Sequence, residues 1–448
     1  MLNKKIDSYL KNDPYPFHMP GHKRSYILRS DLSYGRDFTE IDGFDNLNDP
    51  SDLFVEMEKN IANIYKVKDA IISTNGSTCG ILSAIRSLCK DNKNILIQRS
   101  SHKAVYNSGL INKLTIDYID IKTNDLGAIV DIDYDDLENK IKNKSYGALV
   151  VTSPSYEGYR LDLEKIYNLG QKYKTKVFVD MAHGSHLILD GSYRNFFDLA
   201  VTSFHKNLSA LTPSAALLVN DRSLVNDLRF NMEIFQTSSP SYVILQSIDE
   251  MIENFEKFSD LYRDLEKNLN DLYNLDLKNL EIIDQANKDR SKILISTKNT
   301  NINGIELLDL LKKDNIEIEM AYPSYALLIS SIFDSKDGFD RLKKALTKID
   351  KSLKPAQKNI NFTYAIPEKK YQIYEALEKD RHLYDLDKSL GKISADFIYA
   401  YPPGIPLISP GEIIDQDILD NINRLKANGI SINKDKISCI IDKNNKNW

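Results

Sequence analysis

Short apolar runs alternate with helical patterns between residues 70 and 220. Each run is rich in β-branched residues and ends at a polar or glycine break, after which apolar positions recur three and four apart. Several runs are apolar on both faces, which is typical of strands covered by helices on both sides. The pattern predicts a mostly parallel, seven-stranded sheet. Its strands are expected at Ala70 to Ser73, Asn94 to Gln98, Leu114 to Asp120, Gly147 to Ser153, Lys176 to Asp180, Leu199 to Ser203 and Ala215 to Asn220.

The pattern changes after Pro240. Residues 241–273 contain no Pro or Gly and repeat apolar positions three and four apart, which predicts one long helix or two nearly continuous ones. From residue 284 short strands and helices alternate again, which indicates a compact α+β unit. The α/β chain is therefore expected to have three parts: an N-terminal segment (1–70), a large domain with a trailing helix (71–283) and a small C-terminal α+β domain (284–448).

The composition excludes several classes of protein. The chain has 448 residues, of which 42% are apolar and 27% charged, as in ordinary folded proteins. Its net charge is −5, and the basic residues are interspersed with acidic ones, which disfavours nucleic-acid binding. No run of apolar residues is long enough to span a membrane, and no apolar segment follows the first lysines, so a cytoplasmic location is expected.

Cysteine usage indicates neither a disulfide framework nor a metal site. The three cysteines have no CxxC spacing. We expect them to be reduced and buried as small apolar residues.

Histidines are concentrated in the first half of the chain. Six of the seven occur within the first 205 residues, most of them beside Gly or Ser. A single histidine is usually structural, but a group confined to predicted loops favours a functional site. The six are His18, His22, His102, His183, His186 and His205.

The segment AIISTNGSTCGILSAIRSL reads as a strand, a loop of small residues and an amphipathic helix. Free N–H groups at the start of the helix, with the hydroxyls of Ser77 and Thr78, would form a phosphate cradle. Asn-Gly-Ser loops are also common turns, so this motif alone does not decide the matter. The lysine of a nucleotide-binding P-loop is missing.

Two further strand ends carry charged residues. In KVFVDMAHGSH, Asp180 ends a strand and is either a cap for the next loop or an acceptor for a protonated ring nitrogen. In LAVTSFHKNLSALT, Lys206 follows a strand, and burial between apolar strands would lower its pKa and make it nucleophilic. A strand-end lysine is more often exposed. The order phosphate loop, Asp180, then Lys206 after 26 residues favours the nucleophile.

Together these segments resemble the Orn/Lys/Arg decarboxylase family. Members of this family are pyridoxal-phosphate (PLP) enzymes with the aspartate-aminotransferase fold, which is also called fold type I. The chain resembles the short form, which lacks an N-terminal receiver-like domain. The matching stretches occur in family order and span residues 17–412. They are FHMPGHK (17–23), TNGSTCG (74–80), RSSHKAV (99–105), VTSPSYEGYRLDL (151–163), VDMAHGSH (179–186), SFHKNLSALT (203–212), QTSSPSY (236–242) and YPPGIPLISPGE (401–412).

The resemblance implies a role for each matching residue. Lys206 would be the Schiff-base lysine, Asp180 the acid that pairs with the pyridine nitrogen, and His102 the histidine that stacks on the ring. The remaining cofactor contacts implied in this way are Ser77, Thr78, Ser203 and His205 at the phosphate, Ala182 and His183 beneath the ring, and Ser238 and Ser239 across a subunit interface.

The implied reaction is decarboxylation of arginine, lysine or ornithine to an amine, as in polyamine biosynthesis. The resemblance also implies a homodimer or a larger even-numbered oligomer, with the N-terminal segment near the mouth of the site. It gives no roles for His18, His22 and Lys23. Two residues depart from the family pattern near the expected site, Pro213 after the lysine loop and Glu157 in SPSYEGY.

Three other functions stay open at this point. The chain resembles an aminotransferase or lyase of the same fold less closely, because HMPGHK, SSHK and SFHK belong to the decarboxylase branch. A PLP-binding protein without turnover is the second alternative, on account of Pro213 and Glu157. A scaffold without a cofactor would leave Asp180 and Lys206 unexplained.

Overall fold

The computed structural model describes residues 1–12, 14–356, 366–400 and 404–441. The chain divides into two compact units. The first contains Met1–Leu88, Leu163–Asn168 and Lys176–Leu265, and the second contains Cys89–Asp162, Leu169–Thr175 and Glu266–Trp448. All three cysteines are free and buried, as expected. Among the described residues, no helix combines the length and the apolar character needed to cross a membrane.

The predicted seven-stranded sheet is present, in the order β1-β9-β8-β7-β6-β2-β3. Strands β1, β7 and β8 run in one direction, β2, β3 and β6 are parallel to one another, and β9 is antiparallel to both of its neighbours. All seven predicted strands are confirmed, and no bound differs by more than one residue. They are β1 (Asp69–Ser73), β2 (Asn94–Gln98), β3 (Thr115–Ile119), β6 (Ala148–Thr152), β7 (Lys176–Met181), β8 (Leu199–Ser203) and β9 (Ala215–Val219).

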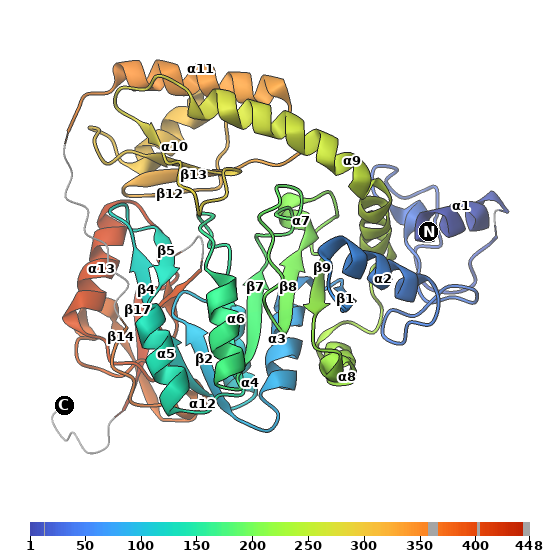
Figure 1. Ribbon diagram of the computed structural model, residues 1–448, viewed down its shortest axis with the longest axis horizontal. Coiled ribbons are helices and arrows are strands. Elements are labelled where there is room, and N and C mark those ends of the chain that lie inside the picture. The colour runs from blue at the N-terminus through green and yellow to red at the C-terminus, as the bar shows by residue number, and fades with distance from the viewer. Residues whose placement is uncertain (13, 357–365, 401–403, 442–448) are drawn as a thin grey trace. The chain divides into compact units, whose positions relative to one another are not determined.

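In the first unit, three strands end at one edge of the sheet. Because β1 and β8 are both antiparallel to β9, and β7 is parallel to β8, their carboxyl ends point the same way. Helix α3 (Gly76–Leu88) follows β1 and packs beneath β8 and β9, while the short α7 (Phe204–Asn207) follows β8. Figure 1 places α7 at the upper end of these strands. Helix α2 (Leu53–Tyr65) contacts β1, and α8 (Val225–Phe235) contacts both β1 and α3.

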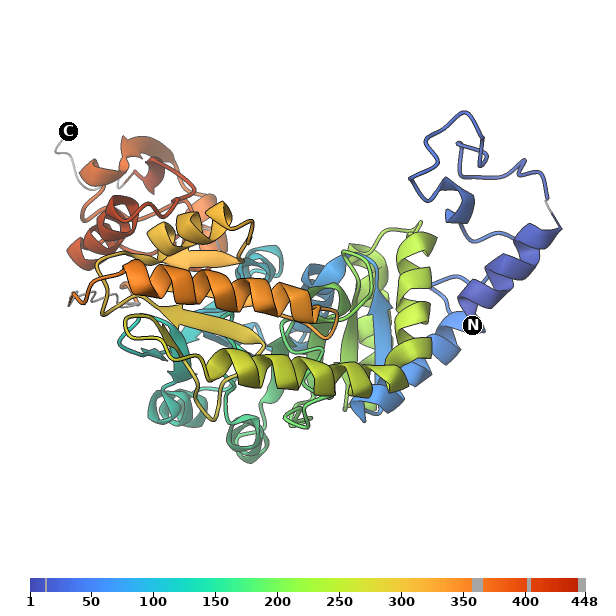
Figure 2. The same ribbon diagram turned by 90° about the horizontal axis from the view of Figure 1, so that it is seen from above.

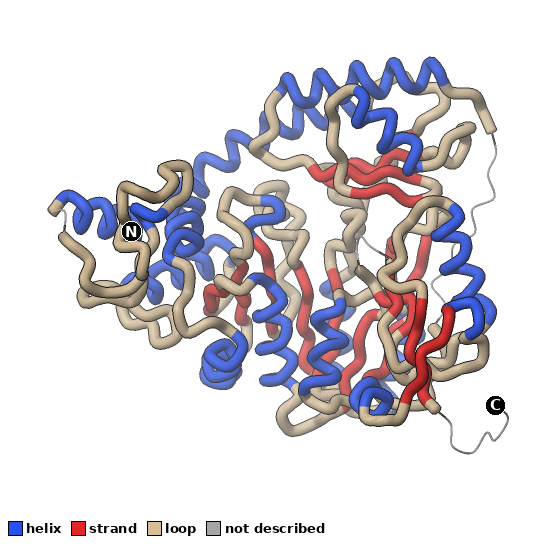
Figure 3. The backbone as a smooth tube through the Cα atoms, turned by 180° about the vertical axis from the view of Figure 1, so that it is seen from behind, coloured by secondary structure: helices blue, strands red, loops and turns tan. Residues whose placement is uncertain are grey.

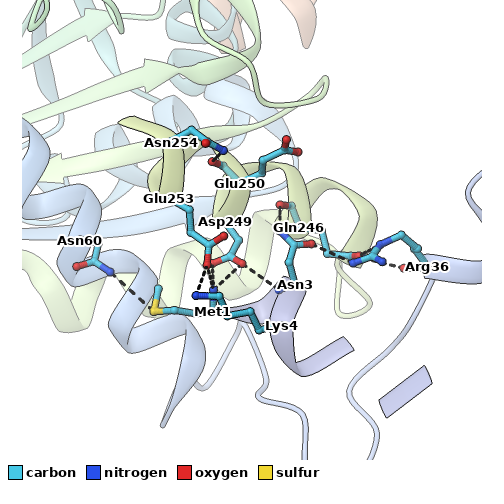
Figure 4. Close-up of polar contacts among 10 residues, drawn as sticks. All are labelled: Met1, Asn3, Lys4, Arg36, Asn60, Gln246, Asp249, Glu250, Glu253 and Asn254. Carbon is cyan, nitrogen blue, oxygen red and sulfur yellow. Dashed lines mark hydrogen bonds and ion pairs between the residues drawn. The ribbon is translucent and has the colours of Figure 1, made fainter. Parts of the chain in front are cut away.

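The N-terminal segment is mostly loop between α1 (Leu2–Lys11) and α2, as the tan colour in Figure 3 shows. It is held to α9 (Tyr242–Tyr273) by polar contacts (Figure 4). The backbone N–H of Asn3 donates to the carboxylate of Asp249 at 2.9 Å, and the amino group of Met1 lies 2.9 Å from the same carboxylate. Arg36 donates to the side chain of Gln246 at 2.6 Å. α9 is one helix of 32 residues, so the first of the two predicted forms is correct.

The second unit contains the predicted C-terminal α+β region. Its four-stranded sheet has the order β10-β11-β13-β12, and α10 and α11 lie on one face of it (Figures 1 and 2). The elements are β10 (Glu281–Ile282), β11 (Lys292–Ser296), α10 (Gly304–Lys313), β12 (Met320–Tyr322), β13 (Tyr325–Ile329) and α11 (Lys336–Ser352). Of the predicted strand IEIEMAY, only the last three residues are extended in a sheet.

The rest of the chain completes the two units with short elements. They are α4 (Lys103–Ile111), β4 (Ile121–Thr123), β5 (Ile129–Ile132), α5 (Tyr134–Asn143), α6 (Leu163–Lys172), α12 (Ile373–Leu377), β14 (Arg381–Asp385), β15 (Ile398–Tyr399), β16 (Pro406–Ile408), α13 (Gln416–Ala427) and β17 (Lys436–Ile440). Of the proline-rich stretch 401–412, residues 401–403 lie outside the described residues.

Candidate functional site

Ser77 and Ser203 meet at the edge where β1 and β8 end. Ser77 lies in the first turn of α3 and is 9% exposed, and Ser203 is the last residue of β8 and is 1% exposed. Their hydroxyl oxygens are 2.5 Å apart. Gly76 enters the helix with φ +71°, a conformation that favours glycine. Thr78 is exposed on the same turn, so both predicted hydroxyls stand at a helix N-terminus, where an anion is favoured.

Gln236 supports the loop that follows β1 and was not predicted from the sequence. It is 7% exposed, its side-chain oxygen accepts the N–H of Thr74 at 3.0 Å, and its amide group donates to Asn48 at 3.3 Å. The N–H of Thr237 donates to Asn75 at 3.4 Å. Gln236 is the first residue of the motif QTSSPSY, so the motif could have indicated it. Only the serines of this motif were predicted to have a role. Ser238 and Ser239 are exposed in the loop between α8 and α9.

Asp180 lies in β7 at the same edge. It is 3% exposed, and one carboxylate oxygen accepts the N–H of Ala182 at 3.1 Å. That contact is the local cap considered above. Among the described residues the carboxylate has no other hydrogen bond. Ala182 is buried beside it and adds no polar group, so the remaining capacity of the carboxylate is available to a donor from a ligand.

Lys206 is exposed, and the expected burial of this lysine is wrong. It lies in α7, whose short turn buries Phe204 and Asn207 and directs Lys206 outward. Its amine nitrogen is 2.9 Å from Nε2 of His183, which is half-buried. The turn that follows β8 decides this exposure, and the apolar strands on either side do not.

His205 is oriented by the backbone before β9. Its Nδ1 is 2.9 Å from the carbonyl oxygen of Ser214. Burial lowers the pKa of His205, and the charge of Lys206 lowers it further, although the contact with Ser214 acts in the opposite direction. In the neutral ring, Nδ1–H would donate to this carbonyl and Nε2 would be the acceptor.

His102 belongs to the second unit. It precedes α4 as its N-cap, and its Nδ1 accepts the N–H of Ala104 at 3.2 Å. The side chain is half-buried. The other predicted site residues belong to the first unit.

The two departures have structural explanations. Glu157 is 3% exposed and accepts hydrogen bonds from the hydroxyls of Tyr325 at 3.0 Å and Ser155 at 3.2 Å. Burial raises its pKa. Pro213 packs beside Gly76, because a Cβ built at Gly76 would stand 3.4 Å from the Pro213 Cβ. Glu157 is thus a buried carboxyl with two hydroxyl donors, and Pro213 packs beside the turn that follows β1.

The side chains of the first unit fit PLP. They offer a reachable amine, a buried carboxylate with spare hydrogen-bonding capacity, and hydroxyls at a helix N-terminus, all at one edge of the sheet. Among the described residues, no group of three or more His, Cys, Asp or Glu side chains is placed to hold a metal ion.

Comparison with known proteins identifies the family. The model of the Orn/Lys/Arg decarboxylase major domain matches residues 2–262, and that of the C-terminal domain matches residues 359–430. The chain belongs to the Orn/Lys/Arg decarboxylase family. Membership of this family makes the protein a decarboxylase and implies PLP as the cofactor.

Similar proteins cover nearly the whole chain. The uncharacterised protein YaaO of Bacillus subtilis is 28% identical over 95% of this chain and 94% of its own length. An arginine decarboxylase of Bacillus anthracis is 27% identical over 94% of this chain and 92% of its own length. The constitutive lysine decarboxylase of E. coli has a similar structure, with a TM-score of 0.84, 17% identity, and coverage of 98% of this chain and 82% of that one. The predicted fold class is thereby confirmed.

Proposed function

We propose that this family member is a PLP-dependent decarboxylase of a basic amino acid, arginine, lysine or ornithine. One observation carries the proposal: Asp180, Ser203 and Lys206 come from neighbouring strand ends of one unit, together with Ser77. The named relatives, an arginine and a lysine decarboxylase, support the substrate class.

In this proposal each residue has a separate task. Lys206 would hold the cofactor covalently, and Asp180 would keep the pyridine nitrogen protonated. Ser77, Thr78, Ser203 and His205 would bind the phosphate, and His183 and Ala182 would lie beneath the ring. When bound, PLP accepts the electron pair released as the bond from the α-carbon to the carboxylate breaks. The carboxylate would leave as CO₂, a proton would take its place on the α-carbon, and an amine would be the product.

The proposal is tested by CO₂ release from arginine, lysine and ornithine in the presence of PLP. Borohydride reduction followed by peptide mass spectrometry should place the cofactor on Lys206. Lys206→Ala should lose the modification and at least about a thousandfold in turnover, because covalent catalysis is removed. Full activity in Lys206→Ala would contradict the assignment. Amine release without keto-acid formation separates the reaction from transamination.

We also propose that the protein is a homodimer in which Ser238 and Ser239 reach the partner's cofactor. Large apolar side chains exposed on the N-terminal segment of the first unit support an interface on this unit. Tyr15 is 72% exposed, Phe17 92% and Tyr26 97%. Light scattering on the purified protein tests this. The double variant Phe17→Ser, Tyr26→Ser should shift the mass toward the monomer, and a wild-type protein that is monomeric at micromolar concentration would contradict the proposal.

A cytoplasmic location, a place in polyamine biosynthesis and the division at residues 70 and 283 stay predictions. The substrate can be identified directly, because the CO₂ assay compares arginine, lysine and ornithine.

A further inference from the structure

A groove in the second unit is lined by strands β11 and β13, by the start of α11 and by residues 316–319. Its volume is about 350 Å³, which is in the range of small-molecule sites. Ile293 of β11 and Leu328 of β13 stand opposite one another in the sheet and share a face. Together with Phe339 and Leu342 of α11, they give the groove a buried, apolar floor.

The rim of the groove is acidic. Glu317, Glu319 and Asp334 line the groove and are exposed. The described lining residues include no lysine, arginine or histidine, so no cation within the groove balances the three rim carboxylates. An apolar floor beneath a negative rim favours a ligand that has an apolar body and positive ends.

Lysines of the neighbouring helix α11 are paired with other acids. Asp340, which does not line the groove, is paired with Lys336 and, at 2.9 Å, with Lys343. Asp314 is paired with Lys348 at 2.8 Å. By contrast, the part of the chain that the structure describes forms no ion pair with the three rim carboxylates. Their negative charge is therefore available to a ligand.

Two of the rim carboxylates are held in position by single hydrogen bonds. The N–H of Ser331 donates to Asp334 at 2.8 Å, and the hydroxyl of Tyr156 donates to Glu319. An ionised carboxylate can accept about four hydrogen bonds. Both groups are thus oriented and keep the capacity to accept the N–H groups of a cation.

We propose that this groove binds linear aliphatic amines that carry a positive charge at each end. The methylene chain would lie on the apolar floor, and each ammonium or guanidinium group would pair with a rim carboxylate. Decarboxylation of lysine, ornithine or arginine yields such an amine. The identification of the ligand as the product of the reaction therefore rests on the proposed function, although binding to the groove does not.

The groove should distinguish the amine from the amino acid by charge. The amino acid keeps its own carboxylate, which three carboxylates at the rim would repel. The amine has lost that group and keeps only positive ends. The groove is therefore suited to sense the product in the presence of the substrate.

Hydrogen–deuterium exchange of the purified protein with PLP tests the proposal, with cadaverine (a linear diamine), pentylamine and lysine as ligands. Cadaverine should protect residues 316–319 and 334–342, and its titration gives the dissociation constant at the groove itself. Pentylamine, with a single charge, should bind about threefold more weakly, because an exposed ion pair contributes about twofold to fivefold. Lysine should give no protection of these residues at the same concentration.

Two variants test the role of the rim. Glu317→Gln should weaken the binding of cadaverine about threefold, and the triple variant Glu317→Gln, Glu319→Gln, Asp334→Asn at least about tenfold. Glu317 is exposed and has no hydrogen bond among the described residues, so the single variant should fold even if the triple variant does not.

The matched control removes three acidic charges from exposed positions of the same unit that do not line the groove. It should bind cadaverine as the wild type does, which would attribute the effect to the rim and not to the net charge of the protein. The control substitutions are Glu266→Gln, Asp276→Asn and Asp309→Asn.

The outcomes separate this proposal from the proposed function. If cadaverine does not protect the groove, or if lysine protects it equally, the proposal is refuted whatever the CO₂ assay gives. Protection by a lysine-rich peptide and not by cadaverine would also refute it, and would make the groove a protein-docking surface. If cadaverine binds the groove but no amino acid releases CO₂, the proposed function fails and the amine site remains.

Discussion

The amine nitrogen of Lys206 lies 2.9 Å from Nε2 of His183. The contact joins the segments that follow β7 and β8, and it places an imidazole beside the amine that the proposed function assigns to the cofactor. An ammonium has donors and no acceptor, so a neutral Nε2 is the partner that suits it. Removal of a proton from Lys206 is required before it attacks a carbonyl, and His183 is placed to accept that proton.

We therefore expect His183→Ala to slow the attachment of PLP to Lys206. A positioned general base contributes at least about a hundredfold in favourable cases, and a loss of about tenfold is a cautious expectation here. Stopped-flow absorbance after mixing the cofactor-free protein with PLP measures the rate. His382→Ala, which changes an exposed histidine of β14, is the control and should match the wild type. An unchanged rate in His183→Ala would show that water serves equally well.

The pH dependence of stability should report on His205. Because its pKa is lowered in the folded state, the unfolded chain binds the proton more tightly. The stability is thus complete above the ordinary value of 6.5 and falls as the pH drops below it toward the folded pKa. His205→Gln should lose less stability than the wild type between about pH 7 and about pH 5. Urea unfolding at both values measures this, and identical losses would contradict it.

A bound phosphate should reverse the preference of His205. An anion near Nε2 favours the imidazolium, which raises the pKa, so PLP binding should take up a proton near pH 7. Calorimetry in two buffers with different ionisation enthalpies measures proton uptake. The uptake should disappear in His205→Gln, and a proton count that is the same in both proteins would assign the uptake to another group.

The sheet was predictable from the sequence because its strands are β-branched runs that stop at polar breaks. Lys176–Met181 and Leu199–Ser203 show this, since each is buried along most of its length. The motif residues followed from the resemblance, and the structure places Ser77 against Ser203 without any signal in the spacing of the two.

Side-chain orientation at the strand ends was not predictable. Whether Lys206 points inward depends on the turn of α7, and whether Gln236 supports Thr74 depends on a contact between residues far apart in the sequence. Arg99 lies in the motif RSSHKAV and Glu412 in the motif YPPGIPLISPGE. Their ion pair was not predictable, because it forms only when the chain folds. The local sequence pattern is therefore sufficient to predict the strands, whereas the side-chain arrangement of the site depends on tertiary contacts.

The ion pair between the buried Glu58 and the half-buried Arg229 should be important for the stability of the first unit. Glu58 is 2% exposed, Arg229 donates to it at 2.6 Å, and the N–H of Ile72 in β1 donates to it at 3.0 Å. Arg229→Met would leave a buried carboxylate without its counter-charge, which costs about 3 kcal/mol in the free energy of unfolding. Urea titration measures this loss. Adding Glu58→Gln should recover part of it, whereas a further loss would mean that the ion pair is not the reason.

Glu157, which departs from the family pattern, is a buried carboxyl of the second unit. Burial raises its pKa above the ordinary 4.5, although the charge of Lys288 and hydrogen bonds from Tyr325 and Ser155 oppose this. A carboxyl with a raised folded pKa contributes its full stability below 4.5 and loses it as the pH rises through the folded value. Glu157→Gln mimics the protonated form at every pH. The stability of this variant relative to the wild type should increase between about pH 5 and about pH 8, measured by urea unfolding.

CO₂ release by Glu157→Gln should stay within about twofold of the wild type, because the hydrogen-bond partners of Glu157 are core residues of the second unit. A large loss of turnover without a loss of stability would instead place Glu157 in the chemistry. The two measurements together therefore decide whether this carboxyl belongs to the core or to the site, since a core role changes only the unfolding curve and its pH dependence.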